Sequence, residues 1–234
     1  MENDLNFEVF LFFSPEKILL SVNRKTDFKL IFKDEFFLEG KPNHLNFDRL
    51  NLFLNENVFK VEKILGTFVE KINIILETKD FLNLQISVKQ NDYNENINSD
   101  IILYLIKSAK YQCEKTIQNM KIIHILIDRY LIDDVHFTTL PLNQKCKNFS
   151  LDISFICLPD ELVKHIEKTL KNFQISVSRI LSGSYIDKFS NDKDINFFKM
   201  TSKIIDGYNK NEVNLVNKTP KNEGFFEKFF NLFN

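Results

Sequence analysis

The succession of strand-like and helix-like segments constrains the fold of this chain more than any other feature of its sequence. Three strands, a helix and two further strands are expected in the first part, at 7–13, 17–22, 28–33, 48–65, 68–76 and 81–88. The turn Ser14-Pro15-Glu16 separates the first two strands. Apolar residues of the helix recur three or four positions apart from Phe47 to Leu65, and Gly66 suits the position after its end.

The second part of the chain mixes the same kinds of element. A helix, two strands, a helix and a strand are expected at 99–119, 121–132, 149–157, 159–170 and 173–181. Ser99 suits the N-cap of the first of these helices, and Pro159 followed by two acidic residues suits the start of the second. The order of elements therefore predicts an α+β fold.

Composition narrows the class of protein. With 44% hydrophobic residues, the 234-residue chain has enough apolar side chains for one large domain or two small ones. Its formal net charge is -1 and no basic block alternates with aromatic residues, so we expect no nucleic-acid partner. Its three cysteines form no CxxC pair and are expected to be reduced and buried, as in a cytosolic protein. The polar N-terminus is unlike a signal peptide, and no apolar run reaches the roughly 20 residues of a membrane-spanning helix.

The chain ends on GFFEKFFNLFN, which places six apolar residues on one face of a helix. These residues are Phe225, Phe226, Phe229, Phe230, Leu232 and Phe233. Lys228 adds attraction to an anionic lipid surface. We therefore predict a membrane-targeting amphipathic helix at 223–234, joined to the rest of the chain by a linker at 190–222. A helix docked on its own domain or on a partner, and a disordered tail, are the alternatives.

Two stretches of the sequence resemble the bacterial cell-division protein FtsA. MKIIHILIDRYLIDD followed by LPLN is similar to the family pattern ILHxxPxxYxxD…NP, with His124, Tyr130, Asp133 and Pro141 at matching places and Ile127 in place of proline. VEKILGTFVEKINIIL is similar to AExxAGxxIxxVxVxI and matches it at four positions, Glu62, Gly66, Val69 and Ile72. The resemblance extends over about residues 9–185 at low identity, and the family also ends in a tether and a short amphipathic helix.

This resemblance implies a domain organisation. Residues 1–72 and 159–189 would form an actin-like (1A-type) subdomain, and residues 73–158 would be an inserted strand-helix-strand-strand (SHS2, 1C-type) subdomain. The second actin-like lobe of the family has no counterpart in this sequence.

The phosphate-binding sequences of the FtsA family are replaced in this chain. The DxGT turn of the family aligns with Phe12, Ser14 and Pro15, and the second, glycine-rich phosphate loop is missing. Phenylalanine cannot coordinate a cation, and proline has no backbone N–H to offer a phosphate. We therefore expect no nucleotide and no other cofactor.

The sequence offers no candidate for catalysis or for metal binding. Its four histidines, His44, His124, His136 and His165, lack a serine or cysteine partner in a recognisable nucleophile motif, and LSGSYI at 181–186 is not a nucleophile elbow. His124, within an apolar run, is expected to be a hydrogen-bonded core or sheet residue. Asp133, Asp134 and His136 are expected to belong to an exposed turn.

These observations predict a non-enzymatic, FtsA-like scaffold of the cell-division machinery, attached peripherally to the inner face of the cell membrane from the cytoplasm. Its partners would be division proteins, FtsZ or later components, together with anionic lipid and further copies of itself. A cytoplasmic adapter of pilus assembly, similar to PilM, is the alternative, because that family also carries an SHS2 insertion. A residual nucleotide-dependent enzyme is a third hypothesis, which a nucleotide-binding measurement would separate from the other two.

Overall fold

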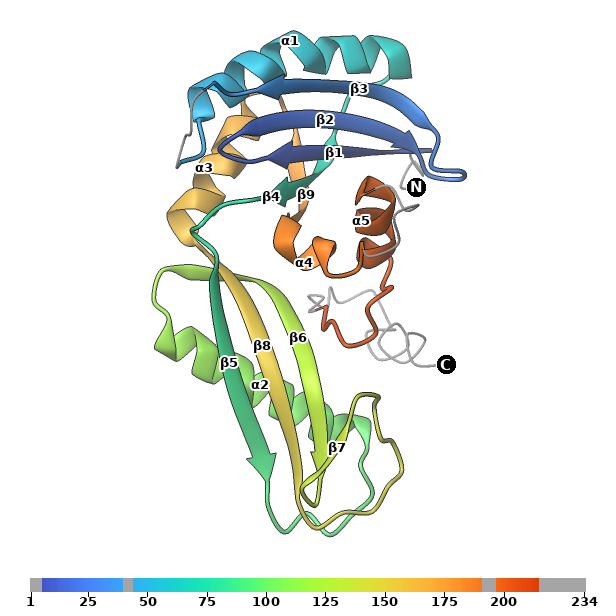
Figure 1. The fold of residues 1–234 in the computed structure, drawn as a ribbon, viewed down its shortest axis with the longest axis vertical. Coiled ribbons are helices and arrows are strands. Elements are labelled where there is room, and N and C mark those ends of the chain that lie inside the picture. The colour runs from blue at the N-terminus through green and yellow to red at the C-terminus, as the bar shows by residue number, and fades with distance from the viewer. Residues whose placement is uncertain (1–5, 40–43, 191–196, 215–234) are drawn as a thin grey trace. The chain divides into compact units, whose positions relative to one another are not determined.

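The computed structural model describes residues 6–39, 44–190 and 197–214. The chain divides into two compact units, which are described separately below. The described residues of Met1–Phe81 and Pro159–Ile204 form unit 1, and those of Leu82–Leu158 and Ile205–Asn234 form unit 2. Unit 1 combines a sheet with several helices and unit 2 combines a sheet with helix α2 (Ser99–Thr116) (Figure 1), which confirms the predicted α+β class.

Unit 1 is built on a five-stranded mixed sheet. Its strands, in the spatial order β3-β2-β1-β4-β9, are Leu30–Phe37, Lys17–Arg24, Phe7–Phe13, Lys71–Leu76 and Ser176–Ser182. The first three strands of the chain pair antiparallel, whereas β1, β4 and β9 run parallel. The parallel strands therefore end at the same edge of the sheet, where open α/β sheets place their ligands.

Helix α1 (Phe47–Leu65) forms where the apolar spacing predicted it, and local signals fix both of its ends. The Asn46 side chain accepts a hydrogen bond from the Arg49 backbone N–H at the start. At the end, Gly66 adopts a left-handed conformation with φ 68° and donates its N–H to the Glu62 carbonyl. The buried face of the helix includes Leu50 and Leu54.

The strands at the centre of unit 1 are apolar on both faces because helices cover both. On one face, Phe13 packs edge-on against Phe47 of α1, with ring centroids 5.4 Å apart. On the other face, Phe10 contacts Phe198 of α5 (Phe197–Ile205) at 5.6 Å. Helix α3 (Asp160–Lys171) precedes β9 along the chain, and the short helix α4 (Gly183–Asp187) follows it. Figure 1 shows α1 and α5 on opposite sides of the sheet.

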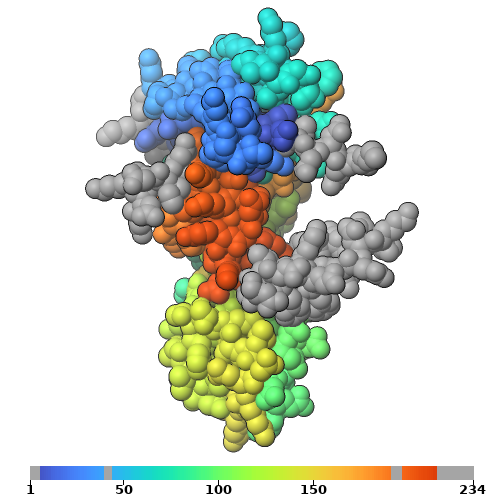
Figure 2. All heavy atoms as spheres, turned by 90° about the vertical axis from the view of Figure 1, so that its right-hand side faces the viewer, coloured from blue at the N-terminus to red at the C-terminus, as the bar shows by residue number. Residues whose placement is uncertain are grey.

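The predicted linker at 190–222 contains folded structure. Helix α5 lies within that range, and its residues Phe198, Met200, Thr201 and Ile204 are buried. In Figure 2 this helix lies against the first strands of unit 1. The apolar spacing NFFKMTSKII supplies one buried face, so these residues pack against β1 instead of forming a linker.

Unit 2 has a four-stranded sheet whose elements follow the order strand, helix, strand, strand along the chain, with a short extra strand in a hairpin. Its strands, in the spatial order β5-β8-β6-β7, are Leu82–Gln90, Phe149–Pro159, Met120–Ile132 and Val135–Phe137. Helix α2 (Ser99–Thr116) contributes Ile102, Leu105 and Ile106 to the core. Its N-cap is Asn98 instead of the expected Ser99, because the Asn98 side chain accepts hydrogen bonds from two backbone N–H groups of the first turn.

The boundary between the two units lies after Phe81, whereas the resemblance implied a boundary after residue 72. Residues 73–76 belong to β4, which pairs with β1 and β9 inside the sheet of unit 1. Among the described residues, no helix combines the length and the apolar character needed to cross a bilayer.

Candidate functional site

A surface cavity of about 430 Å³ lies in unit 1, beside the β1–β2 turn and the carboxyl end of β4. Its walls come from both parts of the unit 1 sequence, and the lining residues are Phe12, Ser14, Glu16, Lys17, Leu19, Phe37, Glu77, Asp187, Phe197 and Phe198. Such a volume is sufficient for a small ligand or for a side chain of a partner. Phe12 and Ser14, two of the positions aligned with the phosphate loop of the FtsA family, are therefore brought into this cavity.

The β1–β2 turn uses its backbone N–H groups internally. Ser14 donates its N–H to the Lys17 carbonyl at 2.9 Å, and its side-chain Oγ accepts the N–H groups of Glu16 at 3.3 Å and Lys17 at 2.9 Å. Pro15, the remaining residue of the turn, has no N–H. Because phosphate loops bind through free backbone N–H groups, this turn has no such donor for a phosphate.

Acidic side chains surround the same cavity. Glu16, Glu77 and Asp187 contribute carboxylates, and Lys17 contributes one ammonium group. Desolvation and the neighbouring Asp187 raise the pKa of Glu77, Lys17 opposes this shift, and Glu16 adds to it. The local charge therefore disfavours a phosphate.

Aromatic rings form the apolar walls of the cavity. The Lys17 Nζ atom lies 5.2 Å from the ring centroid of Phe12 and 5.7 Å from that of Phe37. Both distances are within the range of a cation–π interaction. On the wall formed by α5, Phe197 meets Phe12 edge-on at 6.0 Å between centroids.

Other candidate residues from the sequence occupy structural positions. His124 is buried in unit 2 and its Nδ1 lies 2.8 Å from Oε1 of Glu212, which confirms its prediction as a hydrogen-bonded sheet residue. His165 stacks on Phe47 of α1, with ring centroids 3.7 Å apart. His44 and His136 are exposed. Among the described residues, no three His, Cys, Asp or Glu side chains are grouped as a metal ion would require.

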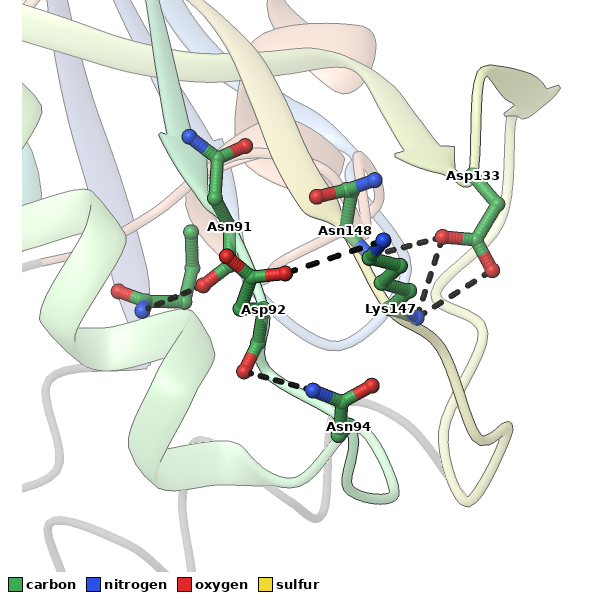
Figure 3. A network of polar contacts seen from close by, with 7 residues as sticks. Asn91, Asp92, Asn94, Asp133, Lys147 and Asn148 are labelled. Carbon is green, nitrogen blue, oxygen red and sulfur yellow. Dashed lines mark hydrogen bonds and ion pairs between the residues drawn. The ribbon is translucent and has the colours of Figure 1, made fainter.

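Asp133 and Asp134 form the two-residue turn of the β6–β7 hairpin, as expected for an exposed turn. Both have positive φ, 45° and 68°, which matches the right-handed twist of the flanking strands. The Asp133 carboxylate accepts the backbone N–H groups of Lys147 and Asn148, and the Lys147 Nζ atom lies 4.0 Å from Asp92 (Figure 3). This network joins the loops at one end of unit 2.

The predicted membrane-binding residues lie outside the described part of the chain. They are Phe225, Phe226, Lys228, Phe229, Phe230, Leu232 and Phe233. Sequence reasoning missed Lys17, Glu77 and Asp187 as site residues. Glu77 directly follows a buried strand, and this position at the carboxyl end of a parallel strand was the signal that could have identified it.

Exposed apolar side chains gather on unit 1, and all of them except Phe37 lie outside the cavity. They lie on β3 and α1 or directly after α1, and are Leu30, Phe36, Phe37, Leu52, Phe59, Ile64 and Phe68. Phe59 and Phe68 are 72% and 76% exposed. Several exposed large apolar residues on neighbouring elements are typical of a protein-interaction surface.

No protein-family model matches the sequence, and no curated protein matches it either. Solved structures do show similarity. One is the cytoplasmic domain of EpsL, an inner-membrane component of the type II secretion system of Vibrio cholerae, with 11% identity and a TM-score of 0.41. The match covers 77% of this chain and 58% of that one.

Two further solved structures are similar at comparable levels. The PilM–PilN type IV pilus biogenesis complex has 9% identity and a TM-score of 0.46, over 78% of this chain and 49% of that one. A Bacteroides thetaiotaomicron protein with an actin-like ATPase fold has 13% identity and a TM-score of 0.32, over 80% and 56%. This chain thus spans between about half and three fifths of the chains it matches. At these identities the likeness concerns the fold alone.

Proposed function

We propose that this chain is a non-enzymatic adapter that acts through protein contacts of its two units and is held peripherally on the inner face of the cell membrane by the amphipathic helix predicted at 223–234. The observation that supports the proposal most strongly is the hydrogen bonding of the β1–β2 turn. Its N–H groups are bonded inside the turn or, at Pro15, absent, so the phosphates of a nucleotide lack their usual partners. An actin-like unit that binds no nucleotide would act by binding other proteins through its surface.

The exposed apolar residues of β3 and α1 support a role in protein binding. Leu52 and Phe59 lie seven positions apart on α1, so they share one face of the helix. Both are more than half exposed, whereas Leu50, Phe53 and Leu54 turn inward. An additional copy of the chain or a different protein would cover this surface.

The residues that carry the resemblance to FtsA have structural roles in this chain. Gly66 ends α1, Tyr130 is buried and its hydroxyl donates to the Asn211 side chain at 3.3 Å, and Asp133 shapes the β6–β7 turn. None of these roles selects a partner. Cell division and pilus assembly therefore remain two settings in which the proposed adapter would act, and in both its SHS2-type unit would serve as a contact module.

Cross-linking in living cells separates these settings. In this experiment a photo-reactive amino acid replaces Phe59, at the centre of the exposed apolar residues of α1. In the control it replaces Lys89 on β5. The adapter proposal expects a specific cross-link to a division or pilus-assembly protein from Phe59. A fluorescent fusion then distinguishes the division site from other parts of the membrane. The proposal would be contradicted if neither position gave a specific cross-link and the fluorescent fusion were spread evenly through the cytoplasm.

A further inference from the structure

We propose that the cavity beside the β1–β2 turn binds an organic cation, through an ammonium or guanidinium group. The inference depends on the walls and charges of the cavity and holds whether or not the chain is an adapter. The same place in the sheet would hold a phosphate if the turn offered free N–H groups, but its chemistry here favours the opposite charge.

The first argument is electrostatic. Three carboxylates, from the β1–β2 turn (Glu16), the end of β4 (Glu77) and α4 (Asp187), line the cavity with one ammonium group, that of Lys17. With all four groups ionised, the cavity carries two excess negative charges. Desolvation and, after it, repulsion from Asp187 disfavour the ionised form of Glu77, and a bound cation would reduce that repulsion.

The second argument comes from the aromatic walls. Phe12 and Phe37 hold the Lys17 ammonium at 5.2 and 5.7 Å from their ring centroids, so the chain itself demonstrates that these rings accept a cation. Phe197 and Phe198 also line the cavity. Aromatic faces combined with carboxylates are the chemistry that recognises ammonium and guanidinium groups.

A compact metal ion fits this cavity less well than an organic cation. Within the described ranges, the carboxylates do not form a group of three that could ligate one ion. A planar guanidinium or an extended amine can instead contact separated carboxylates while its carbon atoms rest on the phenylalanine rings. The cation would come from an arginine or lysine side chain of a partner protein or from a free polyamine, and the experiment compares both.

The test titrates the full-length chain with N-acetyl-arginine amide, with spermidine and with inorganic phosphate, monitored by amide chemical shifts. We expect at least one cationic probe to shift the signals of residues 14–17 and 77 saturably, and phosphate to leave them unchanged. Tighter binding of arginine amide assigns the site to a partner side chain, and tighter binding of spermidine assigns it to a free polyamine.

The variant Lys17→Met gives the most discriminating result. It removes the internal cation from the rings of Phe12 and Phe37 while keeping an unbranched side chain, so cation affinity should rise about two- to fivefold, equivalent to an exposed cation–π interaction. Lys33→Met, on β3 outside the cavity, is the matched control and should change nothing. The double variant Glu77→Gln/Asp187→Asn should weaken binding by roughly two- to tenfold.

Three results would overturn the proposal. One is the absence of a saturable shift with either cation in the native chain and in Lys17→Met. Another is a loss of cation binding in Lys17→Met with an unchanged melting curve. The third is saturable phosphate binding that requires Lys17, which would make the cavity an anion site.

Discussion

His124 and Glu212 form a buried pair that joins the middle of β6 to a segment 88 residues further along the chain, with 2.8 Å between Nδ1 and Oε1. Their side chains are 0% and 3% exposed. Backbone bonds flank the pair, because Ile127 donates its N–H to the Asn211 carbonyl and Val213 donates its N–H to the Ile125 carbonyl. Residues 211–213 therefore extend the sheet of unit 2 along the edge of β6.

Removal of the Glu212 carboxylate should loosen this segment. Glu212→Ala takes a buried hydrogen-bond partner away from His124, at a cost of about 1–3 kcal/mol. The amides of Ile127 and Val213 should then exchange roughly 5- to 150-fold faster with deuterium, since local opening becomes easier. Glu114→Ala, which removes an exposed pair with Lys110, is the control and should leave these amides protected. Equal exchange in Glu212→Ala and the native chain would show that the pair does not hold the segment.

The cysteine thiols should be unreactive in the folded chain. All three are free and buried, and burial and the neighbouring Cys113 raise the pKa of Cys157 to about 12. Because the thiolate is the reactive species, labelling with a disulfide reagent at pH 8 should be at least about 100-fold slower for the native chain than for the chain in denaturant. A thiol that reacts at the denatured rate would contradict the buried positions of Cys113, Cys146 and Cys157.

The cavity carboxylate should make stability depend weakly on pH. The pKa of Glu77 is raised in the folded chain, mainly by desolvation and then by Asp187, so its ionisation opposes folding as pH rises through the folded pKa. Glu77→Gln should therefore raise Tm at pH 7, by up to about 2 °C because the side chain is exposed to solvent. The gain should disappear below the ordinary pKa of 4.5, where Glu77 is protonated in both states. A higher melting temperature for the variant at pH 3.5 as well would exclude this cause.

The sequence predicted the kinds and order of the main elements well, because their signals are local. Asn46 and Gly66 bound α1, and alternation or continuous apolar runs mark the strands. The sequence could not place residues 205–214, because their partners are distant along the chain. Glu212 lies in a polar stretch whose sequence is typical of a linker. The partners of this stretch, the His124 side chain and the backbone of two other β6 residues, are known only from the structure.

The sequence did not predict the cavity as a binding site, although it singled out three residues at the β1–β2 turn. Phe12, Ser14 and Pro15 indicated a phosphate loop without its usual chemistry, and the hydrogen bonds of Ser14 give the physical reason. The aromatic and acidic walls depend on tertiary packing, since α5 lies more than 180 residues from β1 along the chain. Asp187 could not be associated with Glu77 without that packing.

The amphipathic helix predicted from the sequence at 223–234, outside the described residues, should bind lipid without contributing to the stability of the two units. Replacing Phe226 and Phe230 with Glu removes about 1 kcal/mol of membrane-binding free energy for each half-immersed ring and adds two negative charges. The affinity for anionic liposomes should therefore fall at least about 30-fold. Asn231→Glu, on the polar face, is the matched control and should retain most of the binding. A lower Tm for the double variant would instead place these rings in the core, and full liposome binding by that variant would exclude a membrane role for them.

A calorimetric titration of the full-length chain with ATP and magnesium tests the central claim most directly. The turn at Ser14–Lys17 offers no free N–H to a phosphate, and Glu16, Glu77 and Asp187 surround the cavity with negative charge. We predict only the heat of dilution at nucleotide concentrations up to about 1 mM. This concentration is about ten times the Kd of about 100 µM that we take as the weakest meaningful binding. Saturable heat with a Kd below about 100 µM, reduced by Lys17→Met, would show that the cavity is a nucleotide site and would contradict the account.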